Sequence, residues 1–288
     1  MCSSFGNAAD GRCGPAAGSN VSYQSIPGIQ AELADGVLRV TLDRPKRRNA
    51  IDDDMAAALI GYLEGAQNDE SLRCIRIAGA GADFCSGFDL TTRSGGGGER
   101  PRVGAIQRRL PGQAHRLLPL LLDTQVPIVC AVRGWAAGLG LHLVLGADFS
   151  VVANDARIWE PFATRGFTPD SGGTWLIPRL VGVARAKELL MLGRELTGAE
   201  AAEWGLVYRA VAPGEVDAAA DDVVARLAAG PTVALGLTKW LVHRSTAKVF
   251  DEHLADEAFA MELSSRADDF KEGITAMMEK RDPRFSGR

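Results

Sequence analysis

The sequence predicts a protein of the α/β class, because short apolar runs alternate with longer segments of helical pattern. Residues 74–78 and 128–132 are such runs, and the segments between them space their apolar residues as helices do. The chain has 288 residues, of which 46% are hydrophobic, enough for one large core with an appendage. We expect a strand-containing core over residues 26–212 and a helical C-terminal region over residues 213–288.

The overall charge excludes several classes of partner. The formal net charge is −4 and 24% of the residues are charged, so we expect no general binding of nucleic acid or of anionic membranes. No apolar run approaches the roughly 20 residues that span a bilayer. Residues 1–25 are rich in Gly, Ala and Ser and lack an apolar signal core, which predicts a disordered tail and no export.

The cysteines and histidines indicate no metal or disulfide chemistry. The five cysteines show no CxxC pairing, and Cys74, Cys85 and Cys130 lie in or beside apolar runs, where they are expected to pack as small buried side chains. A reduced, cytoplasmic setting fits this pattern. No HExxH motif or clustered ligand spacing occurs, so we expect no metal site.

The first half of the core begins with a strand. Residues Val37–Leu42 alternate in character as a strand does, and a charged loop follows at residues 43–49. Acidic residues open a helix after residue 51, where carboxylates suit the positive end of the helix dipole. The next strand, 74–78, ends in the glycine-bearing loop 79–83.

The second half continues the alternation. The glycine-rich stretch 92–101 is expected to be mobile, and a helix is predicted from about residue 105 to 122. Strands follow at Ile128–Val132 and at 149–152. Thr197 and Glu200 have the spacing of a capping box, and a last strand is predicted over residues 206–211.

Two glycine-bearing segments, 79–90 and 131–142, carry the chemistry. Each follows a predicted strand and places glycines where main chain must approach something closely. A helix is expected to start near Gly138, so main-chain N–H groups there would stabilise negative charge on an oxygen atom. Either segment alone is more often an ordinary turn between strand and helix.

The ordered set of motifs from about residue 26 to 288 resembles the crotonase (enoyl-CoA hydratase/isomerase) superfamily. The matching pieces are Arg44-Pro45 to Asn49-Ala50, Phe84 to Leu90, Gly134 to Gly140, Gly146-Ala147-Asp148, Pro169 to Thr174 and Glu279 to Phe285. The resemblance implies a spiral of ββα turns with a helical C-terminal trimerisation region. It also implies an acyl-CoA substrate, no cofactor beyond the coenzyme A within that substrate, and homotrimers that pair into hexamers.

The resemblance also assigns binding residues. The main-chain N–H groups of Phe88 and Leu139 would form an oxyanion hole for the thioester oxygen; Leu139 stands where hydratases usually have glycine. The residues matched to coenzyme A binding are Lys46, Arg47, Ser86 and Lys280. For the basic loop that contains Lys46 and Arg47, simple solvation is an equally open interpretation.

The two catalytic glutamates of the hydratases are absent. Their matching positions carry His142 and Phe162, so hydration by a glutamate pair is in doubt. Glu160 lies two residues before the expected acid; an extended segment could turn it to the same side, but it is interpreted as a surface residue.

Asp170 is the candidate that could replace the missing acids. It matches an aspartate that moves protons in some enoyl- and dienoyl-CoA isomerases, and a carboxylate in an apolar pocket can accept and return a proton near neutrality. Its alternative role is a helix N-cap. His142 could be a second acid or base, could hold Asp170 by a hydrogen bond, or could be a core residue.

The leading hypothesis is an isomerase-like or hydratase-like enzyme acting on an enoyl-CoA, with Asp170 moving the proton. One alternative is an acyl-CoA-binding protein without catalysis. Another is a hydrolase or dehalogenase in which Asp170 is the nucleophile.

Overall fold

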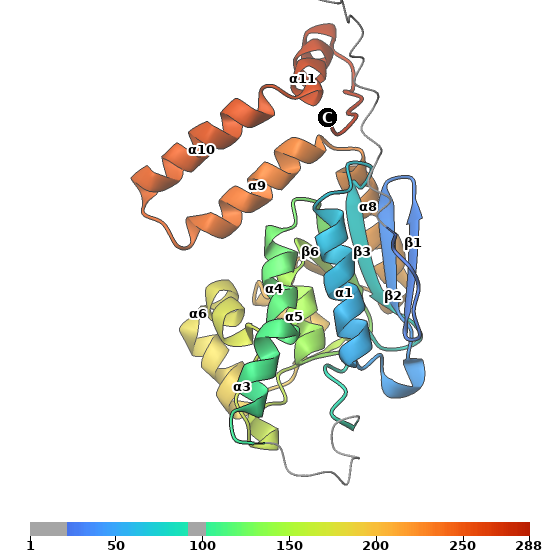
Figure 1. Ribbon diagram of the computed structural model, residues 1–288, viewed down its shortest axis with the longest axis vertical. Coiled ribbons are helices and arrows are strands. Elements are labelled where there is room, and N and C mark those ends of the chain that lie inside the picture. The colour runs from blue at the N-terminus through green and yellow to red at the C-terminus, as the bar shows by residue number, and fades with distance from the viewer. Residues whose placement is uncertain (1–21, 92–101) are drawn as a thin grey trace, which may run out of the picture.

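The computed structural model describes residues 22–91 and 102–288 (Figure 1). Most of the predicted N-terminal tail, residues 1–25, and the glycine-rich stretch 92–101 therefore lie outside the described residues.

The main sheet has six strands in the order β1-β2-β3-β4-β6-β9. The pair β1–β2 is antiparallel and every other neighbouring pair is parallel. The strands are β1 (Ile29–Ala34), β2 (Val37–Leu42), β3 (Cys74–Gly79), β4 (Ile128–Val132), β6 (Phe149–Ala153) and β9 (Arg209–Val211). Every residue of β3 and β4 is buried, as expected for parallel strands covered by helices on both faces.

A second, smaller sheet has the order β5-β7-β8. Its strands are β5 (Trp135–Ala137), β7 (Arg157–Trp159) and β8 (Leu196–Thr197). The strand β5 follows β4 after two residues, so the chain steps from the large sheet to the small one at Gly134, whose φ is +55°. This step carries the second glycine-bearing segment from the end of β4, inside the main sheet, to the edge strand of the small one.

Helices cover the main sheet (Figure 1). Helix α4 packs between α1 and α5. Helix α8 packs on β3, β4 and β6. The helices of the core are α1 (Asp53–Ala66), α3 (Ala105–Arg109), α4 (Ala114–Asp123), α5 (Leu139–Gly146), α6 (Gly173–Leu192), α7 (Gly198–Glu203) and α8 (Val216–Ala228). Short 3₁₀ turns are η1 (Pro45–Arg47), η2 (Leu110–Gly112), η3 (Ala163–Arg165) and η4 (Pro213–Glu215).

The C-terminal helices α9 (Thr232–Ser245), α10 (Phe250–Ser264) and α11 (Asp268–Glu279) extend away from the main sheet (Figure 1). They leave large apolar side chains uncovered within the chain, among them Val242, Phe250, Phe259, Met261 and Met277. The predicted α/β class with a helical C-terminal region is confirmed. Between residues 22 and 91 and beyond residue 101, no helix has both the length and the apolar character that crossing a membrane requires.

Most predicted elements are confirmed, and two differ. The helix predicted over residues 105–122 is two helices, because Pro111 and Gly112 form a 3₁₀ turn between them. The strand predicted over 206–211 begins at Arg209. The strands β1, β5, β7 and β8 and the helix α6 were not predicted. The capping box of Thr197 and Glu200 is confirmed at the start of α7.

Candidate active site

The two glycine-bearing segments lie side by side and pair through main-chain hydrogen bonds, as a parallel bridge between Cys85 and Ala136. The amide of Cys85 donates to the carbonyl of Trp135 at 2.8 Å, and the amide of Ala137 donates to the carbonyl of Cys85 at 3.0 Å. Residues that are far apart in the sequence thereby share one small patch of backbone. The loop after β3 and the turn before α5 form one unit.

Glycines make this close pairing of the two segments possible. Gly87 has a φ of +102°, and a Cβ added there would lie 2.9 Å from the carbonyl oxygen of Ala137. The same Cβ would lie 3.6 Å from the amide nitrogen of Leu139. A Cβ on Gly140 would lie only 2.4 Å from the carbonyl oxygen of Cys85. Any other residue at Gly87 or Gly140 would push the two segments apart.

Leu139 is the first residue of α5, and Gly138 is its N-cap with a φ of +50°. An amide in the first turn of a helix has no acceptor within that helix. The amide of Gly138 is already used, because it donates to the carbonyl of Trp159 at 3.1 Å. The Leu139 amide therefore belongs to the positive end of α5, beside Gly87.

The loop around Phe88 is held from its other side. The amide of Ile51 donates to the carbonyl of Gly87 at 2.9 Å, and the amide of Asp89 donates to the carbonyl of Ile51 at 2.7 Å. The carboxylate of Asp89 accepts from the hydroxyl of Thr91 at 2.6 Å and from the guanidinium of Arg44 at 2.9 Å. The Thr91 and Arg44 donors lower the pKa of Asp89 below its ordinary value.

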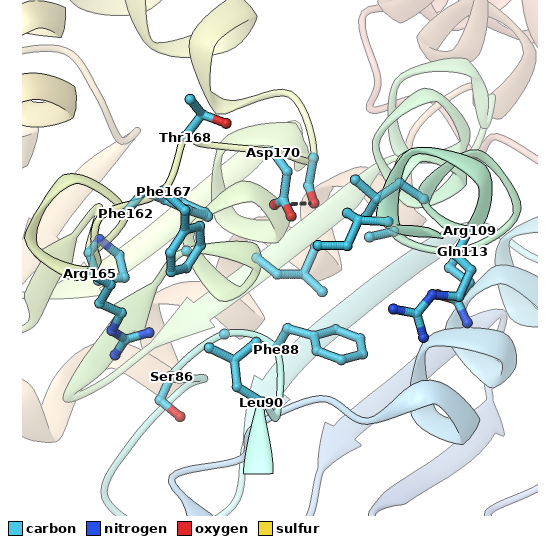
Figure 2. Close-up of a pocket in the computed structure, with 18 residues that line it drawn as sticks. Ser86, Phe88, Leu90, Arg109, Gln113, Phe162, Arg165, Phe167, Thr168 and Asp170 are labelled. Carbon is cyan, nitrogen blue, oxygen red and sulfur yellow. Dashed lines mark hydrogen bonds between the residues drawn. The ribbon is translucent and has the colours of Figure 1, made fainter. Parts of the chain in front are cut away.

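A cavity of about 570 Å³ opens beside the two paired segments (Figure 2). Its walls are mainly apolar and come from both glycine-bearing segments, from the α3–α4 region and from residues 161–171. The described lining residues are Ser86, Gly87, Phe88, Leu90, Ile106, Arg109, Leu110, Gln113, Ala114, Gly138, Leu139, Pro161, Phe162, Arg165, Phe167, Thr168, Asp170 and Ser171.

Asp170 is the one carboxylate among the described residues that line the cavity. Its Oδ1 accepts a hydrogen bond from the hydroxyl of Ser171 at 2.8 Å. The interpretation of Asp170 as a helix N-cap is wrong, since α6 is capped by Gly172 without a side-chain hydrogen bond. Figure 2 shows the Asp170 carboxylate directed into the cavity, across from Phe88.

The structure separates His142 from Asp170 and corrects the interpretation of Glu160. Glu160 is not a surface residue: both side chains are 1% exposed, and Nε2 of His142 lies 2.9 Å from Oε1 of Glu160. His142 does not appear among the described residues that line the cavity. Phe162, which does line the cavity, stacks its ring on the His142 imidazole at a centroid distance of 6.1 Å.

The residues matched to coenzyme A binding are only partly brought together. Ser86 lines the cavity and its hydroxyl donates to the carbonyl of Arg47 at 3.4 Å. Lys46 and Arg47 are exposed in the adjacent turn η1. Lys280 follows α11, at the end of the molecule opposite to α3 and the cavity (Figure 1). Within one chain, Lys280 is therefore remote from the other three.

Sequence reasoning missed two cations of the cavity wall, Arg109 and Arg165. They lie on opposite sides of the cavity in Figure 2. Arg165 follows the loop after β7 and lies over the ring of Trp159. Neither residue belongs to a local motif, so no pattern in the sequence indicated them.

Cysteine and metal chemistry find no support in the described residues. Burial raises the pKa of the Cys85 thiol to about 12, so this thiol stays protonated although Cys85 lies where the two segments pair. Burial raises the pKa of Cys74 likewise to about 12. In the part of the chain that the structure describes, no three His, Cys, Asp or Glu side chains gather as metal ligands would.

Comparison with known proteins places the chain in a family. The enoyl-CoA hydratase/isomerase family matches residues 32–288. The 1,2-epoxyphenylacetyl-CoA isomerase of Escherichia coli (strain K12) is 36% identical over 90% of this chain and 98% of its own. The carnitinyl-CoA dehydratase of Salmonella heidelberg (strain SL476) is 33% identical over 88% of this chain and 95% of its own.

Solved structures similar to this chain belong to the same family. An enoyl-CoA hydratase from Polaromonas sp. JS666 superposes with a TM-score of 0.82 at 30% identity, covering 89% of this chain and 99% of that one. An enoyl-CoA hydratase from Bacillus anthracis gives a TM-score of 0.84 at 28% identity, covering 91% of this chain and 100% of that one. The chain belongs to the enoyl-CoA hydratase/isomerase family of the crotonase superfamily and is an enzyme of that family.

Proposed function

We propose that this enzyme isomerises the double bond of an enoyl-CoA thioester, with Asp170 carrying the proton. The observation that supports this most directly is the single carboxylate among the described residues of the cavity wall. The names of the relatives include isomerases, hydratases and a dehydratase, so family membership leaves the reaction open.

The thioester carbonyl would be polarised by the amides of Phe88 and Leu139. The approach of Gly87 to the Leu139 nitrogen and the start of α5 at Leu139 support this assignment. Two donors placed about 2.7–3.1 Å from the enolate oxygen would each stabilise the transition state by about 3 kcal/mol. The dipole of α5 adds to their effect.

One carboxylate is enough for a double-bond shift. Asp170 would remove a proton from Cγ of a 2-enoyl group. The electrons of that C–H bond then form a double bond between Cβ and Cγ. The original double bond moves to lie between Cα and the carbonyl carbon, and the carbonyl oxygen carries the negative charge of the resulting dienolate. The carboxylic acid of Asp170 then returns the same proton to Cα. This step consumes no water and uses no cofactor or second acid.

Hydration would place different demands on the cavity. It adds a water molecule, and the family's usual arrangement divides activation of water and protonation of carbon between two carboxylates. Phe162 lies in the cavity wall at one of the matching positions, is 6% exposed, and cannot titrate. This favours isomerisation over hydration.

The remainder of the substrate would be held outside the acyl cavity. Ser86, Lys46 and Arg47 lie together at one edge of it and suit the phosphates of coenzyme A. Lys280 would reach the same coenzyme A only from a neighbouring subunit. We therefore propose a homotrimer or hexamer, which the uncovered apolar side chains of α9, α10 and α11 support.

The test is a panel of 2-enoyl- and 3-enoyl-CoA substrates of several chain lengths, including aromatic acyl groups. Isomerisation changes the absorbance of the conjugated thioester and leaves the mass of the product unchanged. A product heavier by one water would contradict the proposal in favour of hydration. Tight binding without any product would instead indicate a binding protein.

A further inference from the structure

The strongest unexplained feature outside the cavity is the buried contact between His142 and Glu160. His142 lies on α5, one turn after Leu139, and Glu160 follows β7 directly. Their Nε2 and Oε1 atoms are 2.9 Å apart, and each side chain is 1% exposed. The mechanism proposed above uses neither residue.

This contact joins three segments that each contribute to the cavity wall. α5 carries Leu139, and Glu160 precedes the lining residues Pro161 and Phe162. The Phe162 ring stacks on the imidazole with an interplanar angle of 5°. The pair therefore lies directly behind one wall of the acyl site.

The third segment is the turn that carries Asp170. A Cβ added to Gly173, the first residue of α6, would lie 2.3 Å from Nε2 of His142. The imidazole thus occupies the space that a side chain at Gly173 would need. The amide of Gly173 donates to the carbonyl of Asp170 at 3.4 Å, so the imidazole packs against the turn that orients Asp170.

The pair is not explained as simple core packing. Nδ1 of His142 and Oε2 of Glu160 have no hydrogen-bond partner among the described residues. Buried polar atoms without partners are destabilising, and apolar side chains of the same volume would avoid that loss. What apolar side chains would not supply is a directional bond between α5 and the segment that precedes Phe162.

We infer that His142 and Glu160 are positioning residues, whose hydrogen bond holds Phe162 and the 170–173 turn so that Asp170 meets the acyl carbon it deprotonates. This inference rests on the proposed function of Asp170. A misplacement of about 1 Å in a reacting group costs about 100-fold in rate. Loss of the bond therefore lowers kcat much more than it weakens binding of the thioester.

The experiment compares Glu160→Ala, which removes the bond, with Glu160→Gln, whose amide oxygen can still accept from Nε2. The matched control is Asp148→Asn, which alters another buried pair. Nζ of Lys239 lies 2.8 Å from Oδ2 of Asp148, with side chains 5% and 13% exposed, and neither residue lines the Asp170 cavity. For each full-length variant we would measure kcat, KM and the Kd of a saturated acyl-CoA.

A second measurement does not depend on turnover. Amide hydrogen exchange over residues 161–174 reports directly whether the wall of the cavity loosens. If wild-type protein isomerises no substrate, the proposed function fails, while exchange and Kd still test the pair. The two failures are therefore distinguishable.

We expect Glu160→Ala to lower kcat about 100-fold, to leave Kd within about three-fold and to accelerate exchange over residues 161–174. Glu160→Gln should retain kcat within about five-fold, and Asp148→Asn should retain both kcat and the exchange pattern even if its Tm falls. Equal losses in Glu160→Ala and Glu160→Gln would overturn the inference. So would an unchanged kcat in Glu160→Ala, or an effect no larger than that of Asp148→Asn.

Discussion

A Cβ built on Gly87 would lie 3.6 Å from the amide nitrogen of Leu139, although 52 positions separate the two residues in the sequence. The positive φ of Gly87 and the turn into α5 are what bring these two stretches of main chain together. The proposed thioester site consists largely of this contact, and changes to it should affect catalysis before they affect folding.

Replacing Gly87 by alanine should therefore lower kcat about 100-fold, the loss expected when one oxyanion donor is displaced. The added Cβ would stand 2.9 Å from the carbonyl oxygen of Ala137, in a φ region that alanine resists. The control is Gly61→Ala within α1, where an added Cβ meets nothing within 4 Å. That variant should keep its kcat and gain about 0.5–1 kcal/mol in free energy of unfolding. Equal kcat values in both variants would rule out the oxyanion assignment.

Asp170→Asn should lower kcat about a thousand-fold while the Kd of a saturated acyl-CoA stays nearly constant, because an amide cannot accept the proton. Asp155→Asn, an exposed residue outside the cavity wall, is the matched control and should behave as wild type. Steady-state kinetics and calorimetry provide both numbers. Full activity in Asp170→Asn would remove this residue from the mechanism.

Arg47→Ala should raise the KM for enoyl-CoA about five-fold, which corresponds to the loss of one exposed ionic contact with a phosphate. The same variant should process the N-acetylcysteamine thioester, which lacks the nucleotide, with unchanged KM. Lys46→Ala is expected to behave similarly. A KM that rises equally for both thioesters would show that Arg47 acts on the loop and not on coenzyme A.

The Asp89 carboxylate should make the protein sensitive to acid. Its pKa is lowered by the Thr91 hydroxyl and Arg44 in the folded protein, so its contribution to stability is complete above the unfolded pKa of about 3.9. That contribution disappears as the pH falls further, through the lower folded pKa. Thermal unfolding between pH 6 and pH 3, in wild type and Asp89→Asn, measures it. We expect the Tm difference between the two to shrink toward the acid end; a constant difference would contradict the assignment.

Light scattering should give a molar mass three or six times that of the chain. The exposed apolar side chains on α9–α11 support the proposed oligomer, in which Lys280 would reach coenzyme A from a neighbouring subunit. Lys280→Ala should then weaken acyl-CoA binding without changing the mass. A monomer at all concentrations would contradict both statements.

The pattern of apolar residues in the sequence was enough to predict the central strands of the fold but not the elements at its edges. The strands β3 and β4 are short, apolar and wholly buried, so their sequences leave little alternative. The edge strand β1 alternates apolar and polar residues from Ile29 to Leu33, but it is short and only one of its six residues is buried, so the alternation marks no core face. The break at Pro111 lies inside an otherwise continuous helical pattern, which concealed it.

The site shows the same division. The glycines of the two segments could be recognised because their chain positions alone imply close approach of main chain. The contact of His142 with Glu160 could not, because it joins side chains on different elements and no spacing in the sequence encodes it. A glutamate that directly follows a strand is ordinarily solvated, and only packing shows that this one is enclosed.

In the proposed mechanism the amides of residues 88 and 139 hold the thioester, and every residue except proline supplies an amide, so other apolar side chains would serve there as long as the glycines at 87 and 140 keep the two segments in contact. A different apolar side chain at Phe88 or Leu139 would then suit a different acyl group and leave the two proposed amide donors in place. A library randomised at these four codons should show tolerance at the first pair of sites and intolerance at the second.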